Sequence, residues 1–341
     1  MVTLKDVAAL ANVSLSTVSI IVNGKAKERN ISLATQERVN HAIMQLGYQP
    51  NAAARRLRYS LENRPRILLF WPFDIRTSMI YSLLTGINQQ LEKIQFDCEL
   101  VIQTYKNDHI EQSSKDLLTN TYNGILVGGA TTTDIEFLEN LNTQIPIVLI
   151  NRNSKKLSTV CVEAVEIAKE AVSLLLHENV KQVTIVSSKS HFSASNQRTK
   201  EFVRQCKAEK IRILPENLLT APNSYEGGMA VAEEYIKLEN KADTIFCESD
   251  VIALGMIYYF NLKGIQVPKE VRLISIGTLD AEQTQYCTPS ITVISVPSEK
   301  IAGAAIDILS EKICSKNSLQ AIQKIVTPEI YIRSSFPVKS N

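Results

Sequence analysis

Residues that start helices recur near the beginning of this sequence, in the segment "TLKDVAALANVSLSTVSIIVNG". Thr3 and Asp6 form a T-x-x-D start signal, and Ser14 follows a break at Asn12 and Val13. Side-chain oxygens at such positions accept hydrogen bonds from the first amides of a helix, so the segment predicts a helix, a tight turn and a second helix. A helix that presents its N-terminal end outward fits the major groove of DNA. The chemistry that these residues predict is contact with base edges and phosphates.

A third helical pattern follows and completes a small unit. It begins near Ser32 and stops at Gly47, and its apolar residues recur at helical spacing: Val39, Ile43, Met44 and Leu46. Three short helices around one small core predict a DNA-binding head at the N-terminus.

The charge of the chain is uneven, although its formal net charge is only +2. Residues 1–66 contain ten Lys or Arg and four Asp or Glu, a net charge of +6, and the remaining 275 residues carry −4. A basic head on a mildly acidic body is expected where only the head meets a polyanion. A solvated run of charges explains the same count about as well.

The segment quoted above, followed by "ATQERVNHAIMQLGYQPNAAARRLR", resembles the LacI/GalR family of bacterial transcription regulators. The resemblance implies that the second helix lies in the major groove of operator DNA. It also implies two sets of contacts, base readers and phosphate-binding residues that position the head. The base readers are Leu15, Ser16 and Ile20, and the phosphate contacts are Thr17, Ser19 and Asn23.

Two features depart from the family pattern. Many members carry Arg or another polar residue where this chain has Ile20, and Ile cannot make the bidentate contact to guanine that Arg makes. Ile20 is instead suited to a thymine methyl group, so the operator sequence of other members does not transfer. The loop "KAKERN" (25–30) is longer than in the family, and its three cations either contact phosphates or are simply solvated.

The segment "YQPNAAARRLR" predicts a short helix that is marginal by itself, because so few residues cannot offset the cost of helix nucleation. By resemblance it is the hinge helix, which pairs with its copy from a second subunit on the operator. Leu57 then wedges into the minor groove, Arg55 and Arg56 flank it on the DNA backbone, and Asn51 is the N-cap candidate. The alternative is that Leu57 is an ordinary linker residue. The linker ends at Pro65.

From residue 66 onward, apolar strand patterns alternate with amphipathic helices, which predicts an α/β fold of parallel sheets covered by helices on both faces. The strands expected are "RILLFW", "DCELVIQT", "GILVGG", "IPIVLIN", "TVCVE", "QVTIVSS", "DTIFCES", "VRLISIG" and "SITVISV". The helices expected include 78–93, 163–177, 194–207 and 250–264. The body resembles the periplasmic-binding-protein-like core of the same family, with two lobes of doubly wound parallel sheet around a cleft.

Three domains are expected from these patterns. Residues 1–49 form the all-α helix-turn-helix head, 50–65 the hinge and linker, and 66–341 the effector-binding and dimerisation body. The resemblance implies that the chain crosses between lobes near Val162, Thr292 and Thr327. The lobes are then about 66–162 plus 292–326, and 163–291 plus 327–341.

Ligands of open α/β sheets bind at the carboxyl ends of the strands, so polar residues just after the strands are expected to line the cleft. Arg198 in "SNQRTKEF" and Asp250 in "CESDVIALG" also match ligand-contacting family motifs, although a salt bridge that closes the lobes explains either residue too. The expected effector-binding residues are Phe73, Asp74, Asn151, Arg152, Glu163, Arg198, Asp250, Thr278 and Asp280. At two positions where family members bind hydroxyl groups of a sugar, this chain has other residues, Leu279 and Glu163-Ala164. This difference weakens the case for a simple hexose as the effector.

Other functions are disfavoured by what the sequence lacks. No dinucleotide, P-loop or nucleophile-elbow motif occurs, and the four His residues are scattered, so an enzyme is not expected. Six separated Cys residues without a C-x-x-C pair indicate neither a disulfide scaffold nor a metal site, and no cofactor is expected. Without an export signal or an apolar run of membrane-spanning length, the protein is expected to be cytoplasmic and not to bind a membrane.

The function predicted is therefore a DNA-binding transcription regulator, expected to be a repressor. It is expected to bind a near-palindromic operator as a homodimer and to be controlled by a small-molecule effector, expected to be a sugar or sugar derivative. The apolar faces of 78–92 and 251–262 are candidate dimer surfaces, although core burial explains them about as well. The alternatives are a regulator that answers to a non-sugar ligand or a protein co-regulator, and, less favoured, a pure small-molecule-binding protein.

Overall fold

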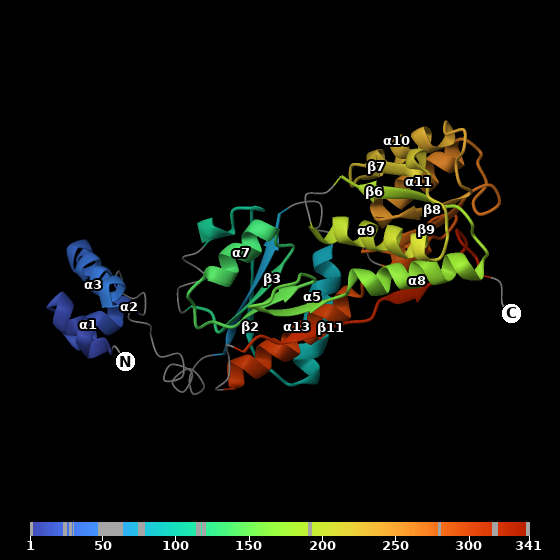
Figure 1. The fold of residues 1–341 in the computed structure, drawn as a ribbon. Helices are drawn as coiled ribbons and strands as arrows, with labels where there is room; N and C mark the ends of the chain where they lie inside the picture. Colours follow the sequence, from blue (N-terminus) through green and yellow to red (C-terminus); the bar gives the residue numbers. More distant parts are fainter. Residues whose placement is uncertain are drawn as a thin grey trace.

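A computed structural model gives the fold of the chain, which consists of a helical head and two α/β lobes (Figure 1). It describes residues 3–22, 26, 29, 31–46, 64–73, 79–113, 117, 121–189, 193–278, 281–315 and 320–338, without the side chains of 193–196.

The head consists of α1 (Leu4–Ala11), α2 (Leu15–Val22) and α3 (Leu33–Leu46). The carboxylate of Asp6 accepts hydrogen bonds from the amide and hydroxyl of Thr3, at 2.7 and 2.8 Å, which fixes the start of α1. Asn12 adopts the left-handed conformation that ends this helix (φ 51°), and α2 leaves at an angle of 107° to α1. The head closes around its own apolar core: Val7, Ala8, Ala11, Val18, Val39 and Ala42. The predicted three-helix head is confirmed.

The first lobe is built on a fully parallel six-stranded sheet in the order β11-β5-β4-β3-β1-β2. The strands are β1 (Arg66–Pro72), β2 (Glu99–Tyr105), β3 (Gly124–Gly128), β4 (Ile147–Ile150), β5 (Ser158–Cys161) and β11 (Gln323–Ile325). Helices α5 (Ile80–Lys93) and α13 (Ser298–Cys314) cover one face, and η2 (Ile110–Ser113) with α7 (Thr132–Asn140) covers the other. Alternate residues of β1 enter the two cores, because successive side chains of a strand point to opposite faces.

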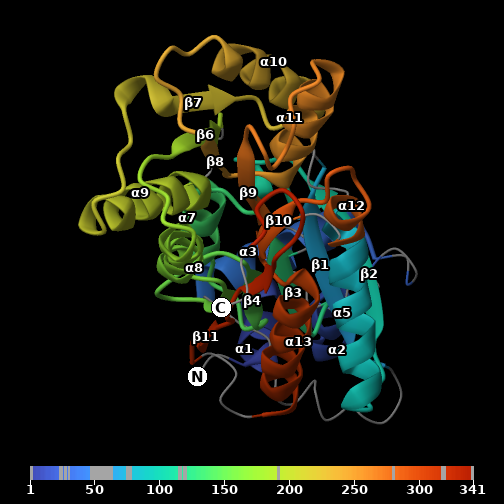
Figure 2. The same cartoon turned by 90° about the vertical axis from the view of Figure 1, so that its right-hand side faces the viewer.

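The second lobe has a sheet in the order β12-β10-β9-β8-β6-β7, in which only β12 runs antiparallel among the described strands. The strands are β6 (Thr184–Ser188), β7 (Leu218–Ala221), β8 (Thr244–Cys247), β9 (Arg272–Gly277), β10 (Thr292–Ser295) and β12 (Glu329–Tyr331). Helices α8 (Ala164–His177) and α9 (Ser193–Ala208) cover one face, and α10 (Tyr225–Ile236) with α11 (Asp250–Leu262) the other. The short elements are η3 (Pro215–Asn217) and α12 (Ala281–Gln285). Figure 2 shows both lobes with their helices.

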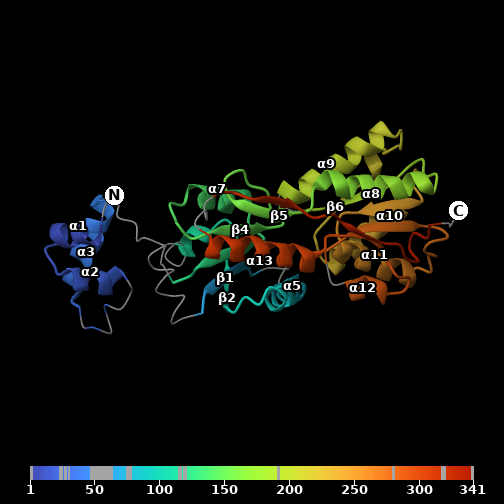
Figure 3. The same cartoon turned by 90° about the horizontal axis from the view of Figure 1, so that it is seen from below.

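The chain passes between the sheets three times (Figure 3). The passages follow β5, β10 and β11, so that β11 belongs to the first sheet and β12 to the second. The sequence predicts the second passage near Thr292, and it lies one strand later. β10 begins at Thr292 and pairs with β9, so the chain leaves the second lobe only after Ser295. One apolar cluster extends through both lobes, from β1 and α13 to α8 and α9.

Two glycines allow α10 and α11 to pack closely where they cross in the second lobe. Gly228 and Gly255 face each other where these helices cross, and a Cβ atom at Gly255 would lie 2.1 Å from the carbonyl oxygen of Tyr225. A side chain at Gly255 therefore cannot fit without separating the helices. Asp250, the first residue of α11, accepts hydrogen bonds from Thr278 just after β9.

Among the described residues, no single helix is both long and apolar enough to cross a membrane.

Candidate DNA interface and effector cleft

Helix α2 carries five of the residues predicted to contact DNA, either at base edges or at phosphates. Leu15 is 44% exposed, Ser16 is also exposed, and Thr17, Ser19 and Ile20 are half-buried. Val18 is fully buried in the core of the head, so its burial sets the rotation of the helix. Leu15, Ser16 and Ile20 thereby keep exposed surface, while the opposite side of α2 holds the head together.

Hydroxyl groups arrange the first turn of α2. The Ser14 hydroxyl accepts a hydrogen bond from the amide of Thr17 at 3.1 Å, which caps the helix. It also lies 2.7 Å from the Ser16 hydroxyl and 2.8 Å from the Thr17 hydroxyl. The side chains of Ser16 and Thr17 are therefore ordered by the cap before any DNA is bound.

Several predicted site residues lie outside the described residues. They are Asn23, Asn51, Arg55, Arg56 and Leu57 of the DNA-binding set, and Asp74 and Asp280 of the effector set.

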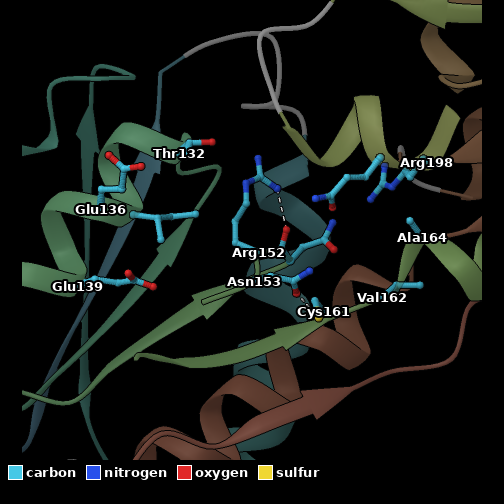
Figure 4. A pocket seen from close by; sticks show the side chains of 12 residues that line it. Thr132, Glu136, Glu139, Arg152, Asn153, Cys161, Val162, Ala164 and Arg198 are labelled. Carbon is cyan, nitrogen blue, oxygen red and sulfur yellow. Dashed lines mark hydrogen bonds between the residues drawn. The ribbon is translucent and has the colours of Figure 1, made fainter. Parts of the chain in front are cut away.

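A cavity of about 260 Å³ opens between the two lobes (Figure 4). It is lined by residues that follow β4 and β5, by one side of α7, and by the start of α9. Arg152 projects into the space between the lobes, with Glu136 and Glu139 of α7 on one side and Arg198 of α9 on the other. The described lining residues are Thr132, Ile135, Glu136, Glu139, Asn151, Arg152, Asn153, Cys161, Val162, Ala164, Gln197 and Arg198.

Backbone carbonyl groups hold Arg152 in place. Its Nε donates to the Ala130 carbonyl oxygen at 2.6 Å, and its Nη1 donates to the Asn151 carbonyl oxygen at 2.7 Å. Asn151 adopts a left-handed conformation (φ 52°) directly after β4, which turns the chain at this point. On the next strand, the Cys161 thiol donates to Oδ1 of Asn153 at 2.9 Å, and burial raises the pKa of this thiol.

Two carboxylates at the strand ends of the second lobe lie near enough to Arg198 to act on its charge. Burial lowers the pKa of the Arg198 guanidinium, and the nearby charges of Glu248 and Asp250 act in the opposite direction. Asp250 is 1% exposed and accepts hydrogen bonds from the amide and hydroxyl of Thr278, at 2.6 and 3.0 Å. Glu248 accepts from the Ser188 amide at 2.9 Å. The carboxylates therefore favour the charged form of Arg198 while they tie the ends of β6, β8 and β9 together.

The structure separates the described effector-site predictions into three groups. Asn151, Arg152 and Arg198 line the common cavity, whereas Asp250 and Thr278 are not among its lining residues and are hydrogen-bonded to each other. Phe73 and Glu163 are not among the lining residues: Phe73 is 79% exposed, and Glu163 is the residue before α8. Sequence reasoning missed the wall formed by α7, with Thr132, Glu136 and Glu139.

A second, smaller cavity of about 40 Å³ adjoins the first inside the first lobe. Asn151 and Arg152 line both cavities. The other lining residues are mostly apolar: Trp71, Met79, Leu83, Gly129, Ile150, Ser298 and Ile301. The described part of the chain contains no cluster of side chains that could hold a metal ion.

A helix-turn-helix head joined to a two-lobed binding core defines a class of protein, the ligand-linked DNA-binding regulator, and comparison with known proteins agrees. Residues 3–51 match the family described as "Bacterial regulatory proteins, lacI family", and residues 177–336 match the "Periplasmic binding protein-like domain". The chain belongs to the LacI family of bacterial transcription regulators.

Its relatives extend over nearly the whole chain. The HTH-type transcriptional repressor CytR of Escherichia coli K12 is 24% identical over 335 residues, which are 98% of this chain and 96% of that protein. The HTH-type transcriptional repressor PurR of Vibrio atlanticus is 28% identical over 346 residues, 98% of each chain. The crystal structure of a LacI family transcription regulator from Clostridium acetobutylicum has a TM-score of 0.73 and 28% identity, and covers 79% of this chain and 100% of that one. The predicted family, fold class and DNA-binding regulatory function are confirmed.

Proposed function

We propose that this regulator binds a near-palindromic operator as a homodimer and that a small hydroxylated effector in the interlobe cavity controls its affinity for DNA. The observation that carries the proposal is the joint presence, in one chain, of an exposed reading helix and a polar cavity lined by both lobes. A ligand that contacts Arg152 of one lobe and Arg198 of the other changes the relative stability of the open and closed lobes. Affinity for DNA can then depend on the ligand, because the two equilibria are linked.

Apolar side chains on the outer surface of α11 support dimerisation. Val251, Leu254, Tyr258 and Leu262 recur at helical spacing on one side of this helix, and Tyr258 and Leu262 are 55% and 61% exposed. Tyr81 of α5 is also exposed, and Figures 2 and 3 show α5 and α11 on the same side of the two lobes. An apolar surface of this kind is typical of an interface, and a two-fold interface places two heads on two half-sites.

Replacing Leu262 by aspartate is expected to weaken dimerisation about tenfold or more. In a two-fold interface each subunit contributes the same residue, so two carboxylates are buried when the dimer forms. Sedimentation equilibrium of the full chain measures the dissociation constant. Lys263→Ala, a change at the neighbouring residue beyond this helix, is the control and is expected to leave the dissociation constant within about threefold. Equal association by Leu262→Asp and the original chain would remove α11 from the interface.

The proposed function is tested by selecting DNA with the full chain. Fragments retained from a random duplex library are expected to share two half-sites related by a two-fold axis, spaced by whole turns of DNA. Because base contacts by Leu15 and Ile20 are apolar, thymine is expected at the positions that they contact. Fragments without a shared sequence, or with a single half-site, would contradict sequence-specific binding by a dimer.

A further inference from the structure

The two adjoining cavities differ in chemistry, and this difference bears on the effector. The larger cavity is lined mainly by charged and amide side chains, whereas the smaller one is lined mainly by apolar side chains of β1, β4, α5 and α13. The Asn151 and Arg152 side chains lie at the boundary, since they line both. A ligand that extends across this boundary meets hydrogen-bonding groups at one end and an apolar pocket at the other.

The apolar side chains that form most of the smaller cavity's wall belong to the packed core. Trp71, Leu83, Ile150 and Ile301 are each less than 5% exposed. The Trp71 ring lies against Gly128, where a Cβ atom would come within 2.2 Å of the ring, so only glycine allows the indole to occupy this position. Side chains held in this way cannot easily rearrange to admit a larger group.

The polar boundary is also fixed. The Arg152 guanidinium is anchored by the carbonyl oxygens of Ala130 and Asn151, at 2.6 and 2.7 Å. Its planar group therefore stays at the junction and can orient the hydroxyl-bearing part of a ligand. Val162 and Ala164 form an apolar part of the wall on the side of the second lobe.

The size of the apolar pocket limits what can enter. A cavity of about 10–15 Å³ holds one water molecule. The pocket of about 40 Å³ therefore has room for about three heavy atoms. An aromatic ring is too large, whereas a methyl, ethyl or propyl group fits. One methylene more or less in an apolar pocket changes affinity by roughly 10–200-fold, so this pocket can act as a strong selector.

We propose that the effector carries one small apolar substituent, of methyl to propyl size, that enters the pocket formed by Trp71, Leu83, Ile150 and Ile301, on a hydroxylated body that occupies the larger cavity. This proposal rests on the proposed function, because it names the chemistry of the ligand in the same cleft. Deoxy sugars and short alkyl glycosides share this chemistry, since each presents an alkyl group beside several hydroxyl groups.

The test uses ligand pairs that differ only at the substituent. The full chain is titrated with L-rhamnose and L-mannose, with D-fucose and D-galactose, and with methyl or propyl glucoside and glucose. The chain contains a single Trp, so its fluorescence reports directly on the pocket. In at least one pair the alkyl-bearing member is expected to bind about tenfold tighter or more and to change the emission of Trp71.

A pocket-filling variant shows where the substituent binds. Ser298 lines the smaller cavity at the start of α13 and is only half-buried, so Ser298→Leu fills the pocket from its edge. This variant is expected to lose the preference for the alkyl-bearing member while it still binds operator DNA. Ser310→Leu makes the same change on the same helix, away from both cavities, and is expected to keep the preference.

Three results would overturn the proposal: parent sugars that bind as tightly as their alkyl-bearing partners, a preference that survives in Ser298→Leu, or binding without a change in Trp71 emission. Absence of binding by every pair would also overturn it. The proposed function has a separate test in the DNA selection, which uses no ligand. Selection of a two-fold operator together with failure of every pair would therefore reject the substituent and leave DNA binding established.

Discussion

Replacing Arg198 by alanine is expected to abolish the response to the effector while operator binding by the free protein changes less than about threefold. Coupling between an effector and DNA is typically worth 5–150-fold in affinity, and this ratio is expected to fall to about one. The physical reason is the position of the guanidinium, which lines the cavity beside the charges of Glu248 and Asp250. Operator affinity is measured by fluorescence anisotropy with and without saturating ligand, at one salt concentration.

Two further variants make the test of Arg198 specific. Arg204→Ala removes a second arginine from α9, one whose guanidinium pairs with Glu201 at 2.5 Å on the exposed surface. Exposed ion pairs contribute little, so this variant is expected to keep the full response. Arg198→Lys keeps the charge but loses the planar fork of donors, and an intermediate response is expected. A full response in Arg198→Ala would show that the ligand binds elsewhere.

Much of the fold could be predicted from the sequence because its central strands are long apolar runs. β1 and β9, for example, are almost entirely buried. A sheet that contains such strands must be covered by helices on both of its faces. The edge strand β11 gave no such signal. All three residues of β11 (Gln323–Ile325) are exposed, and this strand exists only because β5 offers an open edge to pair with. Pairing of this kind is set by tertiary structure rather than by local pattern.

The cleft could be predicted in part, by the rule that ligands bind after the strands. The rule correctly placed Asn151 and Arg152 on the cavity, because both follow β4 directly. It could not find Glu136 and Glu139, which lie on α7 and reach the cavity from the side of a helix.

The position of α7 depends on a distant contact. The buried carboxylate of Asp134 accepts hydrogen bonds from the amides of Thr131, Ile110 and Asp108, at 3.0, 3.2 and 3.3 Å. These bonds tie α7 to the turn that follows β2. The T-x-x-D pattern around Thr131 predicts a helix start, but the pattern does not say which loop the carboxylate also holds.

Leu57 of the hinge lies outside the described residues. The prediction for this residue therefore rests on the family resemblance. Leu57→Ala is expected to weaken operator binding about tenfold or more, because a smaller side chain cannot wedge between base steps and hold the bent DNA. The thermal stability of the body is expected to stay the same, since its described buried core residues all lie between Ile67 and Phe336.

The wedge can be separated from a general effect of the linker. Leu61→Ala makes the same change four residues further along and is expected to leave operator affinity within about threefold. Loss of the wedge removes an apolar contact and not a charge, so the slope of affinity against salt concentration is expected to be the same for Leu57→Ala and the original chain. Arg55→Ala, by contrast, is expected to reduce that slope by about one, because a phosphate contact is lost. An equal loss in Leu57→Ala and Leu61→Ala would assign the effect to the linker as a whole, and the minor-groove role of Leu57 would then be wrong.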